Sequence, residues 1–133
     1  MNDNKNIIPS TGIVVDDGSV TEYIRNKRGD VIGKFTWNPT DIGIIDRYNK
    51  AVADFDKITE PLEQVGINPD GTADGETELD ALRVAEKRLY DACNYIFGGN
   101  MAEAFFGKMH PFSPVNGRFY CENAIEALGQ YIS

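Results

Sequence analysis

The sequence is poor in the side chains that most enzymes use for chemistry. It contains one histidine, His110, two cysteines and one tryptophan. Nucleophilic catalysis needs a nucleophile, a base and an orienting group, and His110 stands alone in a loop, where it is solvated or caps a backbone group. Cys93 and Cys121 form no CxxC pattern, so neither a zinc site nor a disulfide framework is indicated. We therefore expect a protein that is not an enzyme and has no cofactor. Both cysteines are interpreted as small buried residues, with a disulfide or a reactive thiol as the alternative.

The sequence also lacks an excess of basic residues and a long apolar run. Thirteen Lys and Arg oppose 21 Asp and Glu, which gives a formal net charge of -8 and argues against nucleic acid as a partner. No run approaches the roughly 20 apolar residues of a membrane-spanning helix. The polar start of the chain also lacks the apolar core of a signal peptide. These features predict a cytoplasmic protein that binds neither nucleic acid nor membrane. The basic cluster 25–28 is interpreted as a solvated hairpin tip.

The N-terminal part of the chain carries the signals for strands. Residues 1–18 are rich in Asn, Asp, Ser and Gly and are expected to be weakly ordered, with a marginal strand at 13–15. Residues 19–133 are expected to form a single globular domain. Two runs of β-branched and aromatic residues, 20–25 and 31–36, flank a turn sequence and predict a β-hairpin.

Two long amphipathic helices are predicted next. Asn38 or Thr40 is a candidate N-cap for a helix that reaches 64, and Pro61 is expected to kink or end it. Its apolar residues recur at helical spacing and predict one stripe: Ile45, Tyr48, Val52, Phe55, Ile58 and Leu62. A second helix is predicted for 76–97, which makes the pair an antiparallel αα-hairpin.

Two Phe-Gly steps then bracket a compact elbow. Phe97-Gly98 and Phe106-Gly107 enclose a short helix that Asn100 is expected to cap, and each glycine is expected to end a helix. Residues 110–114 are predicted to be extended, and a last helix covers about 117–131. The predicted fold class is therefore α+β and mostly α-helical, with an N-terminal β-hairpin, a long antiparallel αα-hairpin and two short C-terminal helices.

The acidic loop 70–75 is the one candidate metal site. Asp70, Asp74 and Gly75 match positions 1, 5 and 6 of an EF-hand loop. Position 3 is Thr72, and position 12 is Ala81 in place of the bidentate Glu. We therefore interpret this segment as a plain acidic loop, with calcium binding at Asp70 and Asp74 as the weaker alternative.

These features together resemble a known family. The hairpin strand that runs into FTWNPTD at 35–41, a helix with Arg47-Tyr48, a second helix, the elbow 97–107 and a final short helix resemble small tail assembly chaperones. Long-tailed phages and prophages of Gram-positive bacteria encode these proteins. The resemblance covers about residues 20–132, and its motifs are short.

The resemblance implies a function that is not catalytic. Such chaperones coat the tape measure protein and keep its long helices soluble until tail tube subunits polymerise around it, and they are absent from the mature virion. Phe97, Gly98, Phe106 and Gly107 are the motif positions, expected to be structural. Candidate interaction residues are the aromatics Tyr48, Phe55, Phe105 and Phe112. The alternatives are a homo-oligomeric adaptor of a prophage or bacterium and, more weakly, a calcium-binding module or small enzyme.

Overall fold

The chain begins its regular structure with the predicted hairpin. The structure, a computed structural model, describes residues 12–69 and 76–132. Strand β1 (Val20–Arg25) pairs antiparallel with β2 (Val31–Trp37), with Val20 opposite Trp37. The side chain of Asn26 organises the turn, because its Oδ1 accepts hydrogen bonds from the backbone N–H groups of Arg28 and Asp30. The expected strand at 13–15 is wrong, since residues 12–19 form neither helix nor strand.

The first predicted helix is broken, and its expected kink was placed wrongly. It consists of α1 (Gly43–Ala53) and α2 (Phe55–Gln64), with Asp54 leaving helical geometry between them. Pro61 instead lies inside α2. A proline has no N–H for the carbonyl four residues earlier, here that of Lys57. Arg88 of the next helix fills this vacancy, because its Nη1 donates to the Lys57 carbonyl at 2.8 Å.

Neither expected N-cap residue caps α1. The helix begins at Gly43, and the backbone N–H of Gly43 donates to Asp41 Oδ1 at 2.9 Å. The Asn38 side chain accepts from the Thr40 backbone N–H, so it closes a separate turn ahead of the helix. The N-cap residue is Ile42, which makes no side-chain capping bond, because the polar side chains of the segment 38–41 bond within turns ahead of the helix.

The C-terminal half contains one element that we did not predict. Helix α3 (Glu76–Phe97) has the expected bounds and is followed by α4 (Met101–Phe106). The extended segment expected at 110–114 contains a turn and leads into a small hairpin of β3 (Pro114–Val115) and β4 (Arg118–Phe119), before α5 (Tyr120–Ile132). Asn116 and Gly117 both have positive φ, as a tight two-residue hairpin turn requires. The Asn-Gly pair was the sequence signal for this hairpin.

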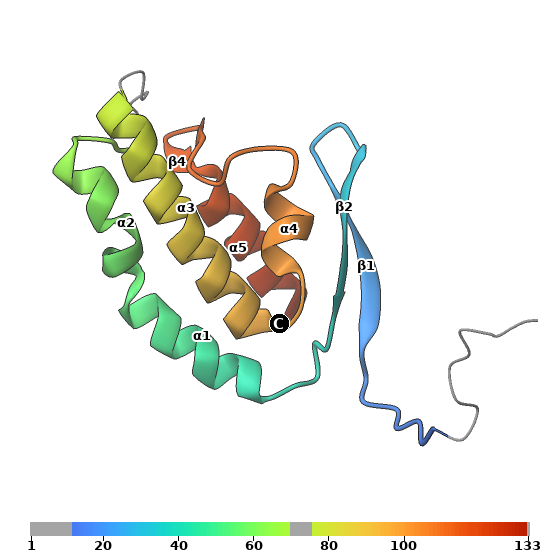
Figure 1. Ribbon diagram of the computed structural model, residues 1–133. Coiled ribbons are helices and arrows are strands. Elements are labelled where there is room, and N and C mark those ends of the chain that lie inside the picture. The colour runs from blue at the N-terminus through green and yellow to red at the C-terminus, as the bar shows by residue number, and fades with distance from the viewer. Residues whose placement is uncertain (1–11, 70–75, 133) are drawn as a thin grey trace, which may run out of the picture.

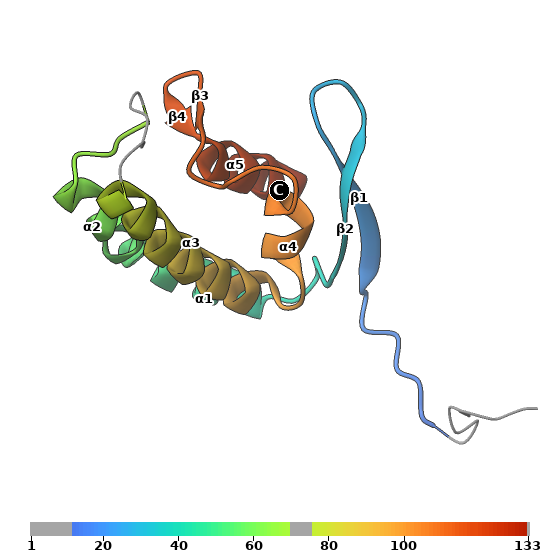
Figure 2. The ribbon, with the colours of Figure 1, turned by 45° about the horizontal axis from the view of Figure 1, so that its top comes forward.

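The elements form a helical body with the β1–β2 hairpin along one side (Figure 1). Helices α1 and α2 follow one another along α3, while α5 and α4 lie on its other side, as the second view shows (Figure 2). Helix α4 packs against both α3 and β2, so it joins the hairpin to the helices. The fold class is confirmed: a β-hairpin, a long helix pair and short C-terminal helices. None of the helices in the described ranges combines the length and apolarity needed to cross a bilayer.

Candidate functional site

The elbow is an internal joint of the fold. Phe97 and Phe106 are buried, and Gly98 and Gly99 take φ values of 65° and 106° where α3 ends. The Phe97 ring meets Trp37 of β2 edge-on, with ring centroids 6.2 Å apart. Phe106 lies between two tyrosine rings, Tyr90 of α3 at 6.0 Å and Tyr120 of α5 at 5.8 Å. The two phenylalanines therefore pack the elbow against β2, α3 and α5.

The ends of α4 are stabilised by residues from outside it. Asn100 is the N-cap residue, as expected, but its side chain makes no capping bond, because it bonds to the β2 backbone, accepting from Thr36 N–H and donating to the Lys34 carbonyl. Asn94 of α3 provides the cap, since its Oδ1 accepts from the Ala102 N–H at 2.8 Å.

Gly107 does not end α4 by a left-handed turn, as we expected. Its φ is -70°, within the right-handed helical region. The last carbonyls of α4 instead accept hydrogen bonds from tyrosine hydroxyls, Tyr120 to Phe105 O at 2.8 Å and Tyr90 to Phe106 O at 3.4 Å. These hydroxyls satisfy acceptors that a helix end leaves open, so the left-handed turn is not needed. Burial raises the pKa of both tyrosines, which keeps them protonated as donors.

Two of the four candidate interaction aromatics do not reach the surface. Phe105 packs edge-on against Phe35, and Phe112 packs against Phe119 at 5.1 Å. Both rings are buried, so they support the core and offer no face to a partner. Phe55 is half-buried and Tyr48 is 38% exposed, and both line a small apolar cavity of about 40 Å³ between α1, α2, α3 and α5.

The residues considered for chemistry have structural environments. His110 Nδ1 accepts from the Phe112 N–H at 3.1 Å, which leaves Nε2 toward Glu86 at 3.7 Å. Both cysteines are buried and unbridged, and burial raises the pKa of each thiol to about 12. In the described part of the chain no three metal-ligating side chains converge. The calcium candidates Asp70 and Asp74 lie outside the described residues.

We predict that the two thiols are unreactive while the protein is folded. The thiolate is the reactive species, and at pH 8 a thiol whose pKa is about 12 is almost entirely protonated. Ellman's reagent at pH 8 should therefore detect almost no thiol in the native protein. In guanidinium chloride it should detect two thiols per chain. Rapid stoichiometric labelling of the native protein would show that at least one thiol is accessible.

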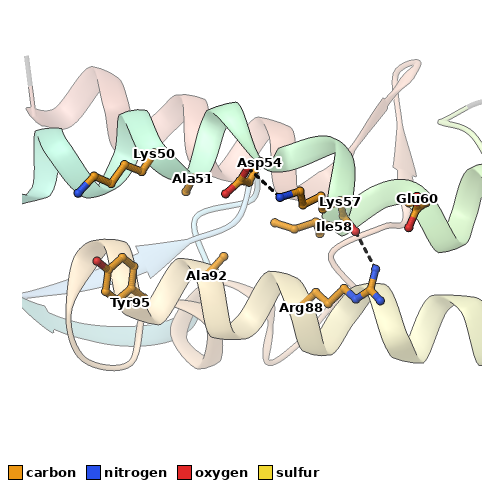
Figure 3. A pocket seen from close by; sticks show the side chains of 9 residues that line it. All are labelled: Lys50, Ala51, Asp54, Lys57, Ile58, Glu60, Arg88, Ala92 and Tyr95. Carbon is orange, nitrogen blue, oxygen red and sulfur yellow. Dashed lines mark hydrogen bonds and ion pairs between the residues drawn. The ribbon is translucent and has the colours of Figure 1, made fainter.

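An open groove lies on the surface between α1–α2 and α3 (Figure 3). It has a volume of about 540 Å³. Its floor is apolar and small, with Ala51 and Ile58 on one side and Ala92 on the other, and the exposed ring of Tyr95 stands at one end. Because two of these floor residues are alanines, the helix backbones leave room above them. We call this surface the α1–α3 groove.

Charged side chains form the rim of the α1–α3 groove. Three are cationic, Lys50, Lys57 and Arg88, and Asp54 and Glu60 also line it. Lys50 pairs with Asp46 at 3.0 Å, and its hydrogen bond to that carboxylate raises the pKa of Lys50. Lys57 pairs with Asp54 at 3.5 Å, and Arg88 is held by the Lys57 carbonyl (Figure 3). Asp54, at the break between α1 and α2, pairs with Lys57 on one side of the rim. Pro61 leaves the Lys57 carbonyl free to hold Arg88 on the other side.

The predicted apolar stripe divides at the helix break: Ile58 and Leu62 in α2 are buried as predicted, whereas the residues in α1 are largely exposed. Helix α1 buries Ile44 and half-buries Ala51 against α3, on a different face from the predicted one. Four apolar side chains at helical spacing are left exposed: Ile42 at 84%, Ile45 at 61%, Tyr48 at 38% and Val52 at 53%. We call these four residues the α1 stripe. No sequence pattern indicates the groove, because side chains from separate helices form its charged rim.

Comparison with known proteins adds nothing to this geometry, since no protein-family model, curated protein or solved structure matches the chain.

Proposed function

We propose that this chain is a non-catalytic tail assembly chaperone of a long-tailed phage or prophage. In this proposal it acts in the host cytoplasm, binds the tape measure protein and keeps it soluble until the tail tube protein replaces it. The observation that carries the proposal is the α1–α3 groove, an open apolar channel with a charged rim. Amphipathic helices bind to other proteins by laying their apolar face into such a groove.

The groove suits a helix that must later be released. Its floor of Ala51, Ile58 and Ala92 accepts apolar side chains, while Tyr95 adds an aromatic contact at one end. The rim charges are solvent-exposed, and exposed ion pairs add little affinity. Binding would therefore rest on a modest apolar area, which favours reversible association over a permanent complex.

Co-expression with a tape measure protein encoded beside this chain tests the proposal. We expect the soluble fraction of that protein to rise several-fold when the chain is present. A Tyr95→Glu variant places a charge on the groove wall and should lower recovery of the complex about tenfold. Tyr95 is 62% exposed, so the substitution should leave folding intact.

Tyr23→Glu is the matched control, because Tyr23 is 59% exposed and lies on the hairpin, away from the groove. It should co-purify with the tape measure protein as the unmodified chain does. Equal insolubility of the tape measure protein with and without this chain would refute the function. Equal loss of binding in both tyrosine variants would refute the groove as the site.

A further inference from the structure

The chain carries an exposed apolar segment just before its first strand. Residues 12–17, which we call the N-terminal arm, include Ile13 and Val14 at 93% exposure and Val15 at 75%. Three consecutive β-branched side chains are thus largely exposed to water. Figure 1 and Figure 2 show the arm leaving the end of β1 and running away from the helices.

The direction of the arm is fixed by hydrogen bonds at its base. The Asp17 carbonyl accepts from the side chains of Asn38 and Thr40, and the Asp16 carboxylate accepts from the Gly18 N–H at 3.0 Å. Gly18 has a φ of 81°, and a Cβ placed there would lie 2.5 Å from Thr40 Oγ1. These contacts fix the direction in which the arm leaves the hairpin.

The same anchor brings the arm close to the start of the α1 stripe. Asn38 and Thr40 immediately precede Ile42, the first residue of that stripe. The three apolar residues of the arm span about 10 Å when extended. Ten helical residues, the span from Ile42 to Val52, rise about 15 Å. The chain therefore presents two exposed apolar surfaces near one another, and the stripe is long enough to accommodate the apolar part of the arm.

We infer that the N-terminal arm of one copy lies along the α1 stripe of a second copy, and that the exchange is reciprocal. A two-fold axis near this end of the molecule lets each copy give one arm and receive one. The seven exposed side chains of arm and stripe present on the order of 1,000 Å² per copy, and burying half of this area in each copy reaches the lower range of specific interfaces. The inference is independent of the groove.

Analytical ultracentrifugation of the full chain tests the exchange. We expect a dimer, and we expect Val14→Asp in the arm and Ile45→Asp in the stripe each to weaken dimerisation at least about 100-fold. Both residues are exposed, so circular dichroism should show unchanged folding. The matched control is Val31→Asp, which changes a 48%-exposed valine on β2 and should leave the dimer intact.

Mixing the two variants distinguishes arm-to-stripe exchange from other interfaces. Val14→Asp keeps an intact stripe and Ile45→Asp keeps an intact arm. In a heterodimer of the two variants, the intact arm can lie along the intact stripe, so one of the two contacts is restored. We expect the mixture to dimerise at a concentration about tenfold lower than either variant alone. No gain on mixing would overturn the arm-to-stripe pairing, and an unmodified chain that stays monomeric at about 100 μM would overturn the dimer. A Tyr95→Glu variant should dimerise normally, so the result for the dimer and the result for the groove can be told apart.

Discussion

Phe106→Ala should lower the free energy of unfolding by about 3–5 kcal/mol, one of the two largest effects that we expect for a single substitution. The ring is 3% exposed and lies between Tyr90 and Tyr120. Truncation would remove both aromatic contacts and leave a cavity where α3, α4 and α5 meet. It would also loosen the tyrosines whose hydroxyls bond to the last carbonyls of α4.

Chemical unfolding measures this effect through the fluorescence of Trp37. This residue is the one tryptophan of the chain and is 3% exposed, so its emission should change on unfolding. Phe55→Ala is the control, because Phe55 is half-buried and lines only a small cavity. Phe55→Ala should lower the free energy of unfolding by less than half as much as Phe106→Ala. A cost below about 1 kcal/mol for Phe106→Ala would mean that the elbow does not depend on the ring packing seen here.

The elements predicted well are those whose signals are local. The hairpin and α3 follow from β-branched runs, turn residues and apolar spacing within the segment itself. The cap of α4 depends instead on Asn94, eight residues before the N–H that it binds, and on hydroxyls from two other helices. Such partners can be identified only from the three-dimensional arrangement of the helices. The β3–β4 hairpin is different, since its Asn-Gly signal was present and local.

The candidate site was predictable only in part, for a related reason. The periodicity of Ile45, Tyr48 and Val52 indicates an apolar face but not what covers it. In the fold α3 lies against the neighbouring face of α1, which Ile44 and Ala51 occupy, so the α1 part of the predicted stripe is largely exposed while its α2 part is buried. Conversely, Phe105 and Phe112 were candidates for contact because aromatic rings are common at interfaces. In the folded protein these two rings are instead buried in the core.

Gly33→Ala should also be strongly destabilising, by about 3 kcal/mol. A Cβ built on Gly33 would lie 1.9 Å from the backbone oxygen of Ala104, so β2 and α4 approach at a distance that only glycine permits. A backbone oxygen cannot rotate away as a side chain does. The added methyl group must therefore separate α4 from the hairpin and strain the bonds from Asn100 to the β2 backbone.

Gly129→Ala is the matched control, because it is the same substitution inside α5, where a Cβ meets no atom within 4 Å. Alanine favours the helix over glycine, so this variant should gain about 0.5–1 kcal/mol. The two substitutions should thus shift the midpoint of Trp37-monitored unfolding in opposite directions. If Gly33→Ala unfolded like the unmodified chain, the close approach of β2 to α4 would be wrong. The joint between the hairpin and the helices would then depend on the aromatic rings of β2 and on the hydrogen bonds of Asn100.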